Sequence, residues 1–210
     1  AWQRASTMKL IDAAIACKAK IVLLPECGHA YTALRWQGAA MLGRPLPFRV
    51  LHISEFLAEN IASGRLRVGK IGRTAAFHDP CQISRRGGAT RAPRFVLEAL
   101  GLELRETADA GDLAFCCGGG GGVIANRRAD ALRYKAFEIK MHQIDATGAE
   151  IRLTSCANCR QTFDDGAAHF HWDKEMGSLL ELVADNLLEP GTDLSPCPRG
   201  EEELTAAASY

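Results

Sequence analysis

Five of the eight cysteines follow a spacing that any fold of this chain has to satisfy. Cys81 is followed after 34 residues by the adjacent pair Cys116–Cys117, and after 38 more by Cys156-x-x-Cys159. Each of the three groups comes just after a segment that we expect to be a strand. Because the carboxyl ends of parallel strands meet at one edge of an open sheet, such a fold would gather these thiols into one pocket.

Segments expected to be strands alternate with segments expected to be helices. The β-branched and apolar runs typical of strands cover residues 21–24, 74–77, 102–106 and 150–154. The amphipathic runs typical of helices cover residues 5–18, 52–63, 92–100, 126–146 and 177–188, with further helices after Cys27 and from Cys156. This alternation predicts an α/β fold built from layered, mainly parallel sheets.

An internal repeat predicts how the chain is divided. Residues 21–27 (IVLLPEC) resemble residues 150–156 (EIRLTSC), and residues 54–61 (SEFLAENI) resemble residues 180–187 (LELVADNL) in the same order. We therefore predict two pseudo-repeated units, of which 1–68 is the first and 69–189 the complete second one. Ala30 stands where the repeat would match Cys159, so the first unit is expected to have lost a metal site of its own.

The two ends of the chain carry separate expectations. The sequence starts without methionine in the middle of an expected helix, and residues 73–125 have no counterpart upstream. We therefore expect the first unit to be truncated and the chain to be a fragment of a longer protein. Residues 190–210 hold three of the eight prolines and an acidic triplet, and we expect them to be a disordered tail.

Composition excludes several classes of protein. The 25 Lys and Arg residues equal the 25 Asp and Glu residues, so no basic field would attract nucleic acid. No apolar run approaches the roughly 18 to 20 residues of a membrane span. A chain of 210 residues with 47% hydrophobic residues can bury a core without disulfides, so a secreted disulfide scaffold fits poorly. Of the remaining cysteines, Cys17 is expected to be a core thiol on a helix face, and Cys197 a free thiol in the tail.

The five spaced cysteines are typical ligands of an iron–sulfur cluster. Thiolate is the protein ligand that such clusters prefer, and a closing C-x-x-C can supply two bonds to one cluster. Adjacent side chains in extended backbone point to opposite faces, so Cys116 and Cys117 reach one cluster only across a sharp turn. Gly118 to Gly122 allow that turn, and the amides of Gly118 and Gly119 could hydrogen-bond cluster sulfurs. A cubane [4Fe-4S] cluster uses four thiolates, which leaves one spare for chemistry at sulfur.

Several other residues could contribute to this site, and the cysteines also allow other interpretations. Arginines that could balance its negative charge are Arg85, Arg86, Arg91, Arg94, Arg127, Arg128, Arg133, Arg152 and Arg160. His78 either hydrogen-bonds the site or simply packs at a strand end. Alternatives to a cluster are a structural zinc site on four of the cysteines and a simple dithiol redox site. The glycine run lacks the Lys-Ser/Thr of a phosphate-binding P-loop.

The same residues resemble a known family. Residues 77–81 (FHDPC), 115–121 (FCCGGGG) and 155–159 (SCANC) resemble the cysteine-rich CCG domain of heterodisulfide reductase catalytic subunits and related iron–sulfur oxidoreductases. The resemblance is strong over residues 73–190 and weak over residues 5–62. The run 85–88 (RRGG), the long glycine run and residues 180–187 are most similar to DsrK-like subunits of membrane-bound sulfur-metabolism complexes.

The resemblance implies a cofactor, a reaction and partners. Cys81, Cys116, Cys117, Cys156 and Cys159 would hold a non-cubane [4Fe-4S] cluster that exchanges electrons with a disulfide through cluster–sulfur intermediates. The partners would be a membrane quinone-reactive subunit, a ferredoxin-like electron donor region and a disulfide-bearing small molecule or carrier protein. The location would be cytoplasmic, at the membrane through a partner. Two alternatives stay open: an electron relay like that of lactate or glycolate oxidation, and a zinc-stabilised interaction module.

Overall fold

The computed structural model describes residues 2–189, so the predicted disordered tail and Cys197 lie outside the described residues. The first part of the chain forms α1 (Trp2–Ala16), β1 (Ile21–Leu24), α2 (Gly28–Leu42), β2 (Arg49–His52) and α3 (Ile53–Ala62). The second part begins with β3 (Thr74–His78), α4 (Arg91–Ala99), β4 (Glu103–Leu104) and the short 3₁₀ turns η1 (Gly111–Leu113), η2 (Val123–Ala125) and η3 (Arg127–Ala129). It ends with α5 (Asp130–Ala146), β5 (Ile151–Thr154), α6 (Ala157–Phe170), β6 (Gly177–Ser178) and α7 (Leu179–Asp185).

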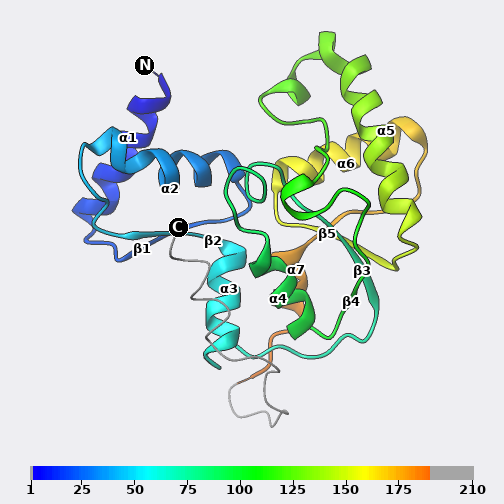
Figure 1. Ribbon diagram of the computed structural model, residues 1–210, viewed down its shortest axis with the longest axis horizontal. Helices are drawn as coiled ribbons and strands as arrows, with labels where there is room; N and C mark the ends of the chain where they lie inside the picture. The colour runs from blue at the N-terminus through cyan, green and yellow to red at the C-terminus, as the bar shows by residue number, and fades with distance from the viewer. Residues whose placement is uncertain (1, 190–210) are drawn as a thin grey trace.

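All named strand pairs are parallel. One sheet contains β1 and β2, and the other has the order β4-β3-β5-β6. The predicted α/β fold with parallel sheets is therefore confirmed. Helices cover both sides of the strands: α1, α2, α5 and α6 lie on one side, and α3, α4 and α7 on the other (Figure 1).

Several predicted boundaries were wrong. The strands β2 and β6 were missed, because each has at most four residues and runs directly into a helix. The helix predicted over 126–146 begins only at Asp130, since two 3₁₀ turns precede it and the Asn126 side chain accepts a hydrogen bond from the Arg128 amide at 3.2 Å. The helix predicted over 177–188 covers 179–185, and the strand predicted over 102–106 covers only 103–104.

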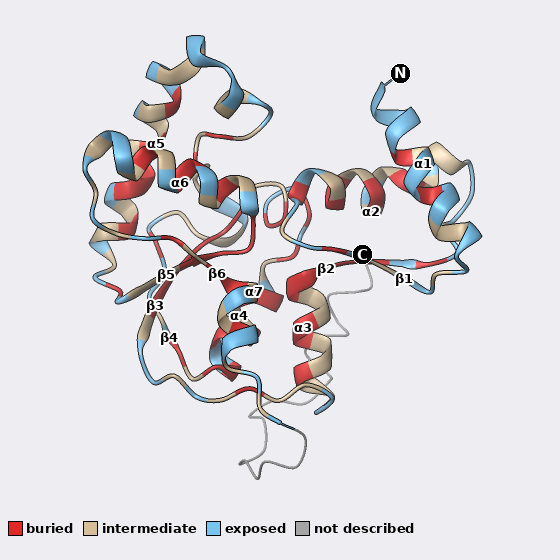
Figure 2. Ribbon diagram, turned by 180° about the vertical axis from the view of Figure 1, so that it is seen from behind, coloured by how far each residue is buried: buried red, intermediate tan, exposed pale blue. Residues whose placement is uncertain are grey.

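Two apolar cores fill the spaces between these layers, and their buried residues appear in red in Figure 2. Tyr31 and Leu34 of α2, Phe137 of α5 and Phe163 of α6 belong to the first core. The second packs α3, α4 and α7 against Phe77 and Leu153 of the sheet. Among the described residues, no helix has the length and apolarity needed to cross a bilayer.

Both parts of the chain use one order of elements. The order α1-β1-α2-β2-α3 recurs as α5-β5-α6-β6-α7, and in both series the first strand pairs in parallel with the second. Cys27 and Cys156 are the N-caps of α2 and α6, with similar extended backbone angles. The division at residues 68 and 189 stays a prediction.

Candidate metal centre

The sheet brings two of the three cysteine groups to one edge. Cys116 and Cys117 lie instead in the loop after η1, well beyond the end of β4, so the prediction that they directly follow a strand was wrong. Strands β3 and β5 pair side by side and end at His78 and Thr154, which are register partners. The Thr154 hydroxyl donates to the His78 carbonyl oxygen at 3.0 Å and fastens the two strand ends together. Cys81 follows the end of β3, and Cys156 follows the end of β5. Cys159 lies in the first turn of α6.

The five cysteines predicted as ligands form a continuous series of thiols. The sulfurs of Cys81 and Cys116 are 4.0 Å apart, and those of Cys117 and Cys159 are 3.4 Å apart. Hydrogen bonds between the thiols of Cys116 and Cys117, and between those of Cys156 and Cys159, complete the series. No disulfide links the cysteines of the described residues.

Two thiols in this series, Cys116 and Cys156, accept hydrogen bonds from their neighbours. Hydrogen bonds from the Cys117 and Cys81 thiols lower the pKa of Cys116 to about 2. A hydrogen bond from the Cys159 thiol, followed by backbone amide donors, lowers the pKa of Cys156 to about 6. The pKa values of Cys81, Cys117 and Cys159 are raised, since these thiols share hydrogen bonds with neighbouring sulfurs. Two positions are thus prepared as thiolates, the form that binds metals.

The first two glycines after Cys117 leave no room for side chains. A Cβ on Gly118 would lie 2.9 Å from the Arg133 carbonyl oxygen, and the φ of Gly118 is +91°. A Cβ on Gly119 would lie 1.9 Å from Thr162 Oγ1. The Gly118 amide donates to Cys116 Sγ at 3.3 Å, and the Gly119 amide donates to Cys117 Sγ. This turn directs two adjacent cysteines toward one pocket.

His78 is buried beside the thiols. One of its ring nitrogens lies within 4.8 Å of the sulfurs of Cys117 and Cys159. Its side chain is fully buried, and within residues 2–189 neither ring nitrogen has a hydrogen-bond partner. Burial lowers the pKa of His78 to about 3, so the ring is neutral. Buried polar atoms are usually hydrogen-bonded. Two unpartnered nitrogens of a neutral imidazole beside these sulfurs therefore indicate that the site accommodates an additional group.

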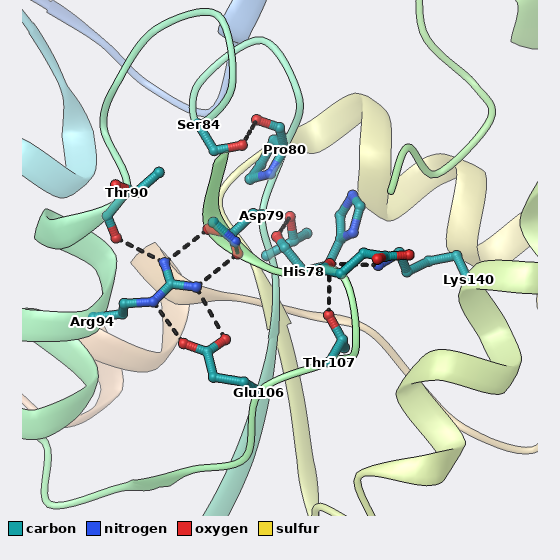
Figure 3. A network of polar contacts seen from close by, with 12 residues as sticks. His78, Asp79, Pro80, Ser84, Thr90, Arg94, Glu106, Thr107 and Lys140 are labelled. Atoms are coloured by element: carbon teal, nitrogen blue, oxygen red, sulfur yellow. Dashed lines mark hydrogen bonds and ion pairs between the residues drawn. The ribbon is translucent and has the colours of Figure 1, made fainter. Parts of the chain in front are cut away.

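Asp79 and Arg94 hold the segment between β3 and Cys81 (Figure 3). Arg94 donates two hydrogen bonds to the buried Asp79 carboxylate, at 2.9 and 2.8 Å, and two more to Glu106. The Gly111 amide also donates to Asp79, at 2.8 Å. This ion pair therefore fixes two segments of the centre: the one before Cys81, and the loop that leads from residue 111 to Cys116.

Lys140 is a buried cation that the sequence analysis missed. It lies on the face of α5 that carries Phe137, Met141 and Ile144, and it donates to the Asp109 carbonyl oxygen at 3.4 Å (Figure 3). Burial lowers its pKa, while nearby acidic groups, including Cys116 and Cys117, oppose that shift. A lysine inside an apolar helix stripe was the signal that could have identified it.

Four of the nine predicted arginines, including Arg94, pair with other groups. Arg133 pairs with Asp165 and Asp130, and Arg160 pairs with Glu181. Arg152 donates to backbone carbonyl oxygens. Among the arginines after the first cysteine, Arg85 acts on Cys81, where its charge lowers the thiol pKa against larger opposing effects.

Two further cysteines lie outside the series of thiols. Cys27 is exposed at the start of α2, and Cys17 is exposed as well. The prediction that Cys17 is a core thiol was wrong, because α1 ends at Ala16 and Cys17 lies in the following turn.

The donor set fits an iron–sulfur cluster. It offers five thiols in a continuous series, amides directed at two of the sulfurs, and two glycines where a Cβ would clash. Sulfur-only ligation with amide donors is the usual protein environment of such clusters.

Comparison with known proteins gives a family and several relatives. Residues 75–164 match the model of the CCG family, described as a cysteine-rich domain. The chain is 34% identical over 173 residues to one subunit of the dihydromethanophenazine:CoB–CoM heterodisulfide reductase of Methanosarcina barkeri, covering 80% of this chain and 41% of that protein. It thus spans about two fifths of that relative's length.

The chain is also similar to two oxidoreductases that are named for other reactions. An EtfAB:quinone oxidoreductase of Syntrophomonas wolfei is 33% identical over 153 residues, which cover 70% of this chain and 21% of that protein. One subunit of the fumarate reductase (CoM/CoB) of Methanothermobacter marburgensis is 34% identical over 144 residues, which cover 67% of this chain and 26% of that protein.

Proposed function

The chain carries a cysteine-rich domain of the CCG family and is similar to one subunit of a heterodisulfide reductase, and from this premise we propose that it is an iron–sulfur oxidoreductase subunit. Its five cysteines hold a [4Fe-4S] cluster that transfers electrons to or from a disulfide or heterodisulfide. The observation that carries this proposal is the series of thiols, in which sulfurs far apart in sequence lie 3.4 and 4.0 Å from each other.

Each residue of the centre has a defined task in this proposal. Cys81, Cys116, Cys117, Cys156 and Cys159 supply thiolates, and the amides of Gly118 and Gly119 donate to the sulfurs of Cys116 and Cys117. A bound cluster supplies electrons one at a time. Lys140 provides a nearby positive charge that offsets the thiolates, and a buried charge of this kind acts in a poorly screened environment.

The number of thiols supports chemistry at sulfur. A cubane cluster requires four thiolates, so the fifth is free to exchange or to bind an unusual, non-cubane cluster. A relay has no need of that extra thiolate. The substrate in this proposal is a disulfide on a small molecule or a carrier protein. The complex also contains a ferredoxin-like electron donor and a quinone-reactive membrane subunit, which keeps the chain on the cytoplasmic side of the membrane.

A pure electron relay is the second candidate function. The similarity to an EtfAB:quinone oxidoreductase favours it, because that name describes electron transfer to a quinone and no disulfide substrate. The same five cysteines would then hold a cluster that only passes electrons.

The test is anaerobic reconstitution with iron and sulfide, followed by iron analysis and EPR of the oxidised protein with and without a thiol. Disulfide chemistry predicts about four irons per chain and an oxidised EPR signal that changes on adding the thiol. A cluster with a thiol-insensitive signal would favour the relay. Stoichiometric zinc with no cluster obtainable would contradict both and leave an interaction module.

Two variants make this test residue-specific. Cys116→Ser removes a sulfur from the middle of the series and is expected to lower iron content at least severalfold. Cys17→Ser removes an exposed thiol outside the series and should leave iron content unchanged. Equal iron content in both variants would contradict the assignment of the ligands.

A further inference from the structure

We propose that Gly28, in the first unit, is a positioning residue of the metal centre in the second unit. Its backbone amide donates a hydrogen bond to Cys156 Sγ. The turn made by Glu26, Cys27 and Gly28, called here the 26–28 turn, thereby completes the environment of Cys156. This inference rests on the proposed function, since it concerns the cluster that Cys156 binds.

The N-termini of α2 and α6 meet at this point. Gly28 is the first residue of α2 and donates to Cys156 Sγ, while the Ala157 amide at the start of α6 donates to the Glu26 carbonyl oxygen at 3.0 Å. The amides of Asn158 and Cys159 also donate to Cys156 Sγ. The positive ends of two helix dipoles therefore converge on one sulfur, and such ends stabilise negative charge.

Close packing fixes the position of Gly28 against the loop of another cysteine. A Cβ at position 28 would lie 2.6 Å from Gln82 Cβ and 3.0 Å from Ile83 Cγ1. Gln82 directly follows Cys81, so Gly28 fits between two segments that carry cysteines of the centre. Only glycine allows its amide to approach Cys156 without displacing the loop after Cys81.

Glu26 holds the turn from the other side. Its Oε1 accepts a hydrogen bond of 2.6 Å from the Ser178 hydroxyl, and its Oε2 lies 4.0 Å from Arg160 Nη1. Ser178 is the N-cap of α7, and Arg160 lies on α6. The backbone of Glu26 has φ +38°, which is costly for a residue other than glycine. A strained conformation of this kind persists only where surrounding contacts determine it.

The physical consequence is a shift in the reduction potential of the bound cluster. Reduction adds negative charge, and an N–H group directed at a cluster sulfur stabilises the reduced form. Hydrogen bonds to cluster sulfurs are among the factors that set this potential. Losing the Gly28 amide should lower the equilibrium constant for reduction about tenfold, which for a one-electron couple is about 59 mV toward more negative potential.

The experiment compares three variants of the reconstituted chain by EPR-monitored redox titration and by iron analysis. Gly28→Ala introduces the methyl group that meets Gln82, and it should shift the midpoint potential to more negative values and change the EPR spectrum. Gly38→Ala is the matched control. It lies further along the same helix, away from the centre, and its new methyl group meets the flexible end of Leu46 at 3.1 Å.

Glu26→Ala keeps the result decisive if Gly28→Ala does not fold. It adds no atoms and removes the anchors to Ser178 and Arg160, so it should shift the potential in the same direction by a smaller amount. If the wild-type chain loads a cluster and both Gly28→Ala and Glu26→Ala keep its potential and spectrum, this inference fails alone. If the wild-type chain binds no cluster, the proposed function fails first.

Discussion

Replacing Gly119 by alanine should disrupt the turn that directs Cys117 toward the metal centre. The new methyl carbon would lie 1.9 Å from Thr162 Oγ1 and 3.0 Å from both Thr162 Cβ and Cγ2, where ordinary contact begins at 3.4 Å. Thr162 is fully buried, and its hydroxyl donates to the Asn158 carbonyl oxygen at 2.8 Å, so the side chain cannot easily turn away. Overpacking of this kind costs about 1–3 kcal/mol.

The neighbouring glycine supplies a matched control. A Cβ on Gly120 meets nothing within 4 Å, and its φ lies outside the left-handed region. Gly120→Ala should therefore be neutral or stabilising, by at most about 1 kcal/mol. For a chain of this size, Gly119→Ala should lower the melting temperature by about 2–12 °C. The assay is thermal unfolding by circular dichroism, combined with iron content after reconstitution.

A double-mutant cycle tests whether the clash between the new methyl group and Thr162 causes the loss of stability. Thr162→Ala removes Oγ1 and Cγ2, which leaves Thr162 Cβ at 3.0 Å as the nearest atom of that residue. In the Thr162→Ala background, the Gly119→Ala change should cost less, with a favourable coupling of about 0.5–3 kcal/mol. Equal effects of Gly119→Ala and Gly120→Ala, or strict additivity with Thr162→Ala, would refute the reasoning.

Two further predictions concern buried polar groups near the centre. Arg94→Met should cost about 3–5 kcal/mol in denaturant unfolding, because it leaves the buried Asp79 carboxylate without its cation, and Arg94→Lys should cost less. Equal losses would contradict a role for the charge. His52 is fully buried and its pKa is lowered to about 4, mainly by burial, so its contribution to stability is complete above pH 6.5 and is lost as the pH falls toward 4. This loss amounts to about 3 kcal/mol and should be missing from the pH–stability curve of His52→Asn, whereas parallel curves for the two proteins would contradict it.

The convergence of Cys81 with Cys156 and Cys159 was predictable because it depends on topology rather than on side-chain detail, whereas that of Cys116 and Cys117 was not, because they lie in a loop after η1. Parallel strands place their carboxyl ends together, so cysteines just after β3 and β5 had to meet wherever those strands are neighbours. The role of the glycines after Cys117 followed from the geometry of adjacent residues. The pairing of β3 with β5 supports the first inference, and the positive φ of Gly118 supports the second.

Charge compensation was less predictable because it depends on three-dimensional packing. Proximity in sequence predicted that arginines would balance the charge of the cysteines, yet Arg133 and Arg160 pair with carboxylates. Lys140, far from any cysteine in sequence, is the buried cation near Cys116 and Cys117. The position of Lys140 follows from how α5 packs, and the spacing of the cysteines gives no information about that packing.

The first unit contributes a contact to the metal centre that sequence motifs could not predict. Because Cys27 and Cys156 occupy equivalent N-cap positions, the repeat indicated that α2 and α6 begin alike, and it presented the first unit as a copy that had lost its metal site. The structure gives the same turn a contact with the surviving site, since the Gly28 amide donates to Cys156 Sγ. That contact joins residues more than a hundred positions apart through the meeting of two helix ends. In the proposed function, the first unit would therefore act on the cluster through a backbone amide, which no pattern of side chains reveals.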